Sequence, residues 1–217
     1  MKMNAIILLL FIALFSSSYT FQLVSCYGDS DFCVANLLTP YTSSGYECKP
    51  PKDVTVDDFV FSGFVSGKPI DPFNIRLTVA SVNNLPGLNG LDISAARVDV
   101  GVNGTIAMHF HPHASELFIM VQGQLKAGFV TPPNLVFVKD IKPGDVMVFP
   151  EGVVHFVVNS GDTVAVAFAT YTTSNPSFHF LDHLLFANDL PTSIISQSTF
   201  LDFSQIIKLK ALFGGSG

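Results

Sequence analysis

Cysteine is scarce in this chain of 217 residues, which contains only three. They stand at Cys26, Cys33 and Cys48, far from the main group of histidines. A zinc finger therefore has no support, because its thiolates and imidazoles follow each other at short, regular spacings. In an oxidising compartment we expect Cys33 and Cys48 to pair, and two free thiols are the alternative.

Charged residues are also scarce, and long apolar runs are nearly absent. Asp and Glu outnumber Lys and Arg by 17 to 11, and no basic patch is found, which argues against nucleic acid as a partner. The long apolar run at residues 5–15 (AIILLLFIALF) follows Lys2 and is too short to cross a bilayer comfortably. This pattern is typical of a secretory signal peptide, with an uncleaved anchor as the alternative. We expect residues 1–26 to be the signal, 27–217 to form one domain, and the protein to be secreted to the extracellular space without a membrane span.

What the chain does contain is a series of short strand-like runs. Residues 27–58 carry Pro40, Pro50 and Pro51, which favour an extended arm tied by the cysteines. From residue 59 to residue 172, short runs of Val, Ile, Phe and Thr alternate with turn signals, which predicts an antiparallel sandwich or barrel.

Three of these runs are apolar on both faces: residues 117–121, 145–150 and 164–171. A strand with two apolar faces indicates that a second sheet or a neighbouring subunit covers its outer side.

Two segments near the C-terminus have helical spacing, residues 178–187 and 203–213. The second follows Asp202, has Gln205 three positions later and ends before Gly214, which predicts a capping box and a glycine stop. We expect these helices to pack outside the barrel, across a subunit contact. In the first segment, His179 and His183 stand four residues apart, and we interpret them as surface or interface residues.

Half of the six histidines lie in residues 109–113 (HFHPH). In a strand, His109 and His111 would point to the same face, and Glu116 and His155 could face the same interior. Several imidazoles and a carboxylate converging in an apolar barrel need a cation to balance their lone pairs. For the HxH pair alone, an exposed strand edge that binds nothing would be the simpler interpretation. We interpret His113, which follows Pro112, as a residue that is not a ligand.

The spacing around these residues extends into two longer motifs. The first continues from Glu116 to Gly123. The second, residues 144–159 (GDVMVFPEGVVHFVVN), has the following fixed positions: Gly144, Pro150, Gly152, His155 and Asn159. Together they resemble the two motifs of the cupin superfamily, except that Asn103 replaces the opening glycine of the first.

A closer resemblance joins the chain to the plant germins and germin-like proteins, near their auxin-binding-protein-like branch. It rests on residues 31–37 (DFCVANL), 111–116 (HPHASE) and 188–202 (NDLPTSIISQSTFLD). The resemblance implies an all-β jelly-roll barrel with a disulfide-tied N-terminal arm and C-terminal helices. It also implies a homohexamer built as a trimer of dimers and secretion to the apoplast.

The resemblance further implies a manganese ion held by His109, His111, Glu116 and His155. Such donors would also accept Fe, Zn, Ni or Cu. The same resemblance implies a Cys33–Cys48 disulfide. Asn103 begins an Asn-Gly-Thr sequon and is a candidate glycosylation site.

The resemblance offers several activities for this site. Oxalate oxidase, the activity of the true germins, uses two asparagines near the metal, and Ala96 and Ile106 stand at those positions here. Neither can donate a hydrogen bond, so we expect little oxalate oxidase activity. Superoxide dismutation needs less, namely the metal, an open position and a proton source, so superoxide or another small anion is the expected ligand. The alternatives are non-enzymatic, auxin-like binding in a pocket lined by Ala96, Ile106, Met108, Phe118 and Met120, or a structural role in the cell wall or in defence.

Overall fold

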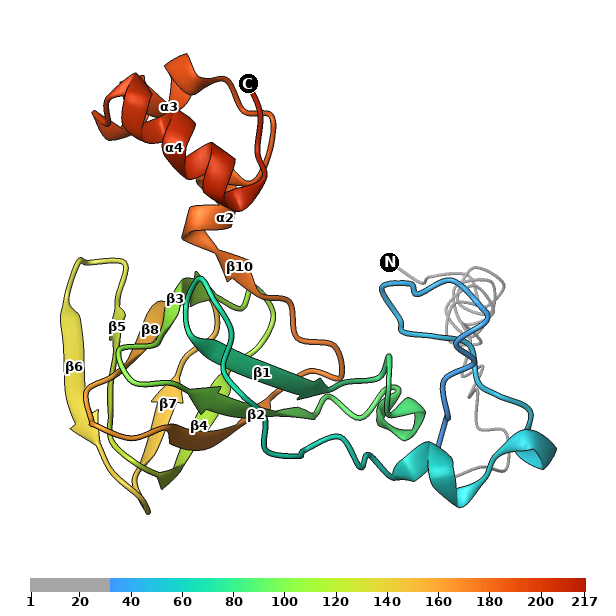
Figure 1. Ribbon diagram of the computed structural model, residues 1–217. Coiled ribbons are helices and arrows are strands. Elements are labelled where there is room, and N and C mark those ends of the chain that lie inside the picture. Colours follow the sequence, from blue (N-terminus) through green and yellow to red (C-terminus); the bar gives the residue numbers. More distant parts are fainter. Residues whose placement is uncertain (1–31) are drawn as a thin grey trace, which may run out of the picture. The chain divides into compact units, whose positions relative to one another are not determined.

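The computed structural model describes residues 32–217, which form two five-stranded antiparallel sheets followed by helices (Figure 1). The first sheet has the order β1-β2-β9-β4-β7, and the second has the order β10-β3-β8-β5-β6. The strands of the first sheet are β1 (Ile75–Ala80), β2 (Ser94–Val100), β9 (Ala165–Tyr171), β4 (Glu116–Gln122) and β7 (Val146–Phe149). Those of the second are β10 (His179–Phe180), β3 (Thr105–Phe110), β8 (Val154–Asn159), β5 (Leu125–Val130) and β6 (Val136–Ile141). The predicted jelly-roll barrel is confirmed, while the expected signal peptide lies outside the described residues.

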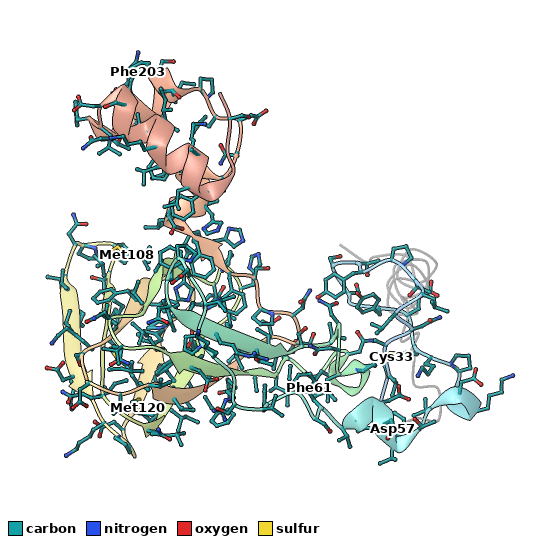
Figure 2. The ribbon with its side chains drawn as sticks, viewed as in Figure 1. Cys33, Asp57, Phe61, Met108, Met120 and Phe203 are labelled. Carbon is teal, nitrogen blue, oxygen red and sulfur yellow. A yellow bond between two sulfur atoms is a disulfide. The ribbon has the colours of Figure 1, made fainter. Side chains whose placement is uncertain are left out.

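The hydrophobic core lies inside the barrel and draws on both sheets. Phe118 and Met120 from β4, Phe149 from β7 and Leu125 from β5 are all fully buried members of it. Because side chains alternate along a strand, every second residue of these strands enters this core. The side chains of both sheets are drawn in Figure 2.

The N-terminal arm is tied down where the sequence predicts. Cys33 and Cys48 form a disulfide, with their Cα atoms 4.9 Å apart, which is an ordinary separation. Two short 3-10 turns follow, η1 (Pro51–Asp53) and η2 (Val56–Phe59). Lys49 donates to the carboxylate of the buried Asp58 at 2.6 Å. These contacts order the arm within the described part of the chain.

The outer face of strands β4 and β7 is apolar and open to solvent in the single chain. Its side chains Leu117, Val121, Val146 and Val148 are between 38% and 55% exposed. The second sheet covers the inner faces of these two runs, whereas in the third run Phe64 packs on the outer residue Phe168, with ring centroids 5.6 Å apart. The outer faces of β4 and β7 fit the expected subunit contact, which stays a prediction.

Three helices close the chain: α2 (Leu181–Phe186), α3 (Thr192–Thr199) and α4 (Phe203–Phe213). The predicted bounds of α4 are confirmed. The amide of Asp202 donates to the Gln205 side chain at 3.3 Å, and Gly214 has φ +80°, so the capping box and glycine stop are both present. The helices share a small core of their own around Phe186, Ile195 and Ile206.

The helical prediction for residues 178–187 is only half right. His179 lies in β10, which pairs with β3, and the helix α2 begins at Leu181. His179 and His183 therefore do not share a helix face. The strand partner on β3 overrides the local helical spacing, which a single segment of sequence does not reveal.

Candidate metal centre

Four predicted side chains meet inside the barrel and come from both sheets. His109 lies on β3 opposite His155 on β8, in the second sheet. Glu116 is the first residue of β4, in the first sheet. His111 follows β3 directly, and its carbonyl accepts a hydrogen bond from the amide of Gly152 at 2.9 Å. This bond ties the two sequence motifs together through the main chain.

The side chains are close together and shielded from solvent. One donor atom from each of the four lies within 4.8 Å of the others, and every residue is at most 5% exposed. Glu116 Oε2 lies 3.0 Å from His111 Nε2 and 3.2 Å from His155 Nε2. A single small ion at this point would be within reach of all four groups.

The main chain fixes which nitrogen each imidazole presents to the centre. The Nδ1 atoms of His109, His111 and His155 donate to the carbonyl oxygens of Ala107, Ser177 and Val153, at 2.8, 2.7 and 2.8 Å. A carbonyl oxygen can only accept, so Nδ1 must carry the proton. In a neutral imidazole, Nε2 then holds a lone pair, and the Nε2 atoms of His111 and His155 face the Glu116 carboxylate.

This arrangement of lone pairs needs positive charge at its middle. Protons on Nε2 could supply it, but only by making the imidazoles cationic inside an apolar barrel, which is costly. A divalent metal satisfies the same lone pairs with one ion, and backbone-anchored histidines are the usual surroundings of such ions. The four residues therefore form a metal site with three nitrogen donors and one oxygen donor.

The electrostatics of the individual groups agree with this. Burial, reinforced by the neighbouring His155, lowers the pKa of His109 to about 3, so its imidazole is neutral. Burial alone would raise the pKa of the Glu116 carboxyl. Protons on the Nε2 atoms of His111 and His155 would outweigh that effect and lower the pKa to about 2; a cation bound between these atoms and the carboxylate acts in the same direction, so Glu116 is an anion.

Aromatic rings surround the centre and were not predicted. Phe149 stacks on His155 with ring centroids 4.4 Å apart, and Phe180 stacks on His109 at 5.0 Å. Phe178 and Tyr171 lie 4.8 and 5.0 Å from the His111 ring. Burial, and then the charge of Glu116, raise the pKa of the Tyr171 phenol, which stays neutral. These residues come from distant strands, so no spacing within one segment of sequence points to them.

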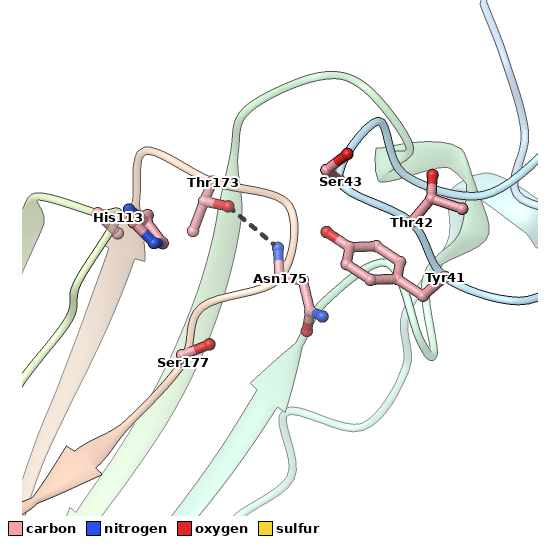
Figure 3. A pocket seen from close by; sticks show the side chains of 8 residues that line it. Tyr41, Thr42, Ser43, His113, Thr173, Asn175 and Ser177 are labelled. Carbon is pink, nitrogen blue, oxygen red and sulfur yellow. Dashed lines mark hydrogen bonds between the residues drawn. The ribbon is translucent and has the colours of Figure 1, made fainter.

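The remaining histidines stay outside the centre. His113 is exposed and lines a separate pocket of about 430 Å³ with Tyr41, Thr173 and Asn175 (Figure 3). His183 pairs with Asp182 at 2.8 Å and lies against Phe213. Neither belongs to a group of metal-binding residues in the described part of the chain.

Four of the five residues predicted to line an apolar pocket are buried and Met108 is not, while the pocket itself stays a prediction. Ala96, Ile106, Phe118 and Met120 are buried in the barrel core, but Met108 is 49% exposed (Figure 2). The register between β3 and β8 shifts between Ile106 and His109, which turns His109 inward and Met108 outward. Strict alternation from Ile106 would have placed Met108 inside.

Asn103 lies at the turn between β2 and β3, exposed, with φ +60°. Asparagine tolerates this left-handed conformation better than most residues, which accounts for it at a position where the motif has glycine. Its glycosylation stays a prediction.

Comparison with known proteins places this fold and site in a family. The pattern described as "Cupin" matches residues 64–206. The chain belongs to the cupin family. The Auxin-binding protein ABP19a of Prunus persica is 48% identical over 187 residues, which cover 86% of this chain and 90% of that protein. Germin-like protein subfamily 3 member 1 of Arabidopsis thaliana is 46% identical over 188 residues, with the same shares covered.

A solved structure of oxalate oxidase has a similar fold, with a TM-score of 0.80, 30% identity, and coverage of 85% of this chain and 95% of that one. The cupin described here is thus a germin-like or auxin-binding-type protein with a buried metal site. Among residues 32–217, no helix is long and apolar enough to cross a membrane.

Proposed function

We propose that this germin-like cupin is a secreted manganese protein of the apoplast that removes superoxide, with little oxalate oxidase activity. The observation that carries the proposal is the orientation of the three imidazoles. Their Nδ1 atoms are anchored to carbonyl oxygens, and their other nitrogens are left for a shared ion beside Glu116. Three nitrogens and one carboxylate oxygen leave positions open on a six-coordinate ion.

Manganese bound there would supply one-electron chemistry, by which superoxide and protons become dioxygen and hydrogen peroxide. The chain's own residues do the rest. His109, His111, Glu116 and His155 hold the ion, and the rings of Phe149, Phe178 and Phe180 limit the water around it. The net charge of −6 does not steer an anion inward from a distance, so local groups at the centre must favour its entry.

Two buried positions argue against oxalate as the substrate. Ala96 is fully buried and Ile106 is 6% exposed, both within the barrel core, and neither offers a hydrogen bond. A dicarboxylate that entered here would lose its contacts with water without gaining replacements from these side chains. We expect oxalate turnover by this chain to be slow.

The test is one purified, secreted sample analysed in three ways. We expect about one manganese per chain by elemental analysis, consumption of superoxide, and no brisk turnover of oxalate. Bound iron, zinc, nickel or copper would show that the ion is not manganese. A metal-loaded protein that does not consume superoxide would refute the enzymatic proposal.

Binding of a small aromatic carboxylate is the second candidate. It is supported by the apolar, aromatic-rich interior and by the similarity to a protein named for auxin binding. In this case the site would retain a carboxylate without turnover. Saturable binding of an indole acid, lost when a chelator removes the metal, would favour this candidate over both superoxide chemistry and a structural role in the cell wall or in defence.

We further propose a homohexamer, a trimer of dimers, as the working form. The exposed apolar side chains Leu117, Val121, Val146 and Val148 support buried subunit contacts. Light scattering should give a mass several times that of one chain, and a monomer at micromolar concentration would contradict the proposal. A fall in mass on enzymatic removal of N-linked sugar would test the predicted glycosylation of Asn103.

A further inference from the structure

One polar side chain beside the centre has no partner. Tyr171, the last residue of β9, is 3% exposed and belongs to the barrel core. No hydrogen bond joins its hydroxyl to a residue in the described part of the chain, whereas Ser94, its neighbour on β2, donates to the Thr173 carbonyl at 2.6 Å. A hydroxyl that makes no hydrogen bond within the protein is available to a ligand or to water, so its place in an apolar core needs an explanation.

The hydroxyl is also accessible to a small ligand. Every fully buried side-chain oxygen and nitrogen between residues 32 and 217 has a hydrogen-bond partner. Since the Tyr171 oxygen has none, it cannot be completely sealed off and must border a small free space. The phenol ring itself belongs to the barrel core.

The strand register directs Tyr171 toward the metal centre. Tyr171 lies directly opposite Glu116 in the β4–β9 pair, and directly opposite residues of antiparallel strands project from the same face. The Tyr171 ring is 5.0 Å from the His111 ring and 5.7 Å from the Phe178 ring. The phenol therefore stands next to two of the proposed metal ligands, without a bond to either.

We propose that Tyr171 donates a hydrogen bond to the small anion that enters the metal centre, and so helps to determine which ligand is held there. This inference rests on the metal site proposed above. The class of ligand is a small anion with an accessible acceptor atom, such as superoxide or a carboxylate. Because Ala96 and Ile106 offer no hydrogen bonds, the phenol is the donor that this apolar interior provides in their place. It donates without needing to ionise.

Azide is a suitable probe, because it is a small anion that accepts hydrogen bonds and binds metals. Its affinity for the metal-loaded protein would be measured by calorimetry in the unmodified chain and in two variants. Tyr171→Phe removes the hydroxyl and keeps the ring that packs on His111. Tyr41→Phe is the matched control, because it removes a phenol that is 47% exposed and outside the centre.

We expect Tyr171→Phe to keep its metal and to bind azide roughly ten- to a hundredfold more weakly, the usual effect of one hydrogen bond to a charged group. Tyr41→Phe should bind azide as the unmodified chain does. Unchanged azide affinity in a metal-loaded Tyr171→Phe, or no azide binding by the metal-loaded unmodified protein, would overturn the inference alone. Loss of metal from Tyr171→Phe would overturn it too, because the hydroxyl would then support the ligands. An unmodified protein without metal would instead overturn the proposed function on which it rests.

Discussion

Replacing Glu116 by glutamine is the most direct test of the metal centre. The amide has nearly the size of the carboxylate, so the barrel core around it should stay packed. What changes is the charge: the single carboxylate among the three imidazoles becomes a neutral amide. Glutamine is a poor ligand for a transition metal, and we therefore expect Glu116→Gln to lose its ion.

The size of the effect follows from the ligand count. Loss of a group that only supports a ligand weakens metal binding by about 10- to 100-fold, so loss of one of four ligands should weaken it at least a hundredfold. A metal present at about 100 times its dissociation constant stabilises a folded protein by about 2.7 kcal/mol. Glu116→Gln should forfeit most of that, which corresponds to a fall in melting temperature of roughly 5–10 °C for a domain of this size.

The assay is thermal unfolding with added manganese and again after chelation. Glu151→Gln is the matched control, because Glu151 is exposed on the turn before β8. With metal, Glu116→Gln should melt well below both the unmodified chain and the control, and after chelation the gap should shrink. An equal gap in both conditions would show that Glu116 stabilises the fold through hydrogen bonds alone, and the reasoning from lone pairs would be wrong.

Three further predictions follow from other parts of the structure. Cys33→Ala should lower the free energy of unfolding by about 3 kcal/mol in urea titrations, because the disulfide closes a loop of 15 residues; an unchanged midpoint would contradict this. Gly123→Ala should lower the free energy of unfolding by about 1–3 kcal/mol, because Gly123 has φ +79° and a Cβ there would come 2.8 Å from the Ala165 Cα. Gly144→Ala is the control: Gly144 has φ +94° but open space around a Cβ, so the free energy of unfolding should fall by less. Below pH 6.5, stability measured by urea titration after chelation should fall. In this pH range the unfolded chain protonates His109 near its ordinary pKa, whereas the pKa of His109 in the folded chain is about 3, so the unfolded state binds more protons. A free energy of unfolding that does not change between pH 6.5 and about pH 3 would refute this prediction.

The features that the sequence predicts well are local or repeated. The helix α4 carries its own start and stop signals in Asp202, Gln205 and Gly214, so its bounds could be read directly. The four metal-site residues were found because their spacing within two motifs matches a known family. The strand alternation then explains why His109 and His155 share an interior.

The features that were missed depend on partners far away in the chain. His179 has helical spacing with His183, but pairing with β3 makes it a strand residue. Met108 is turned outward by an irregular register with β8. Tyr171 meets Glu116 only because β9 and β4 are neighbours in the sheet. Each of these depends on the pairing of strands distant in sequence, which no window of sequence contains.

Because the metal ligands come from both sheets, the bound ion affects when the protein can bind metal during folding and how slowly it unfolds. Residues 109 and 155 lie on one sheet and residue 116 on the other, so the ion has no complete site until the two sheets have come together. Metal capture must therefore follow the slow pairing of distant strands rather than guide it. Once bound, the ion links the two sheets, and their separation would break metal bonds as well as the core. The unfolding rate, more than the folding rate, should then depend on the metal.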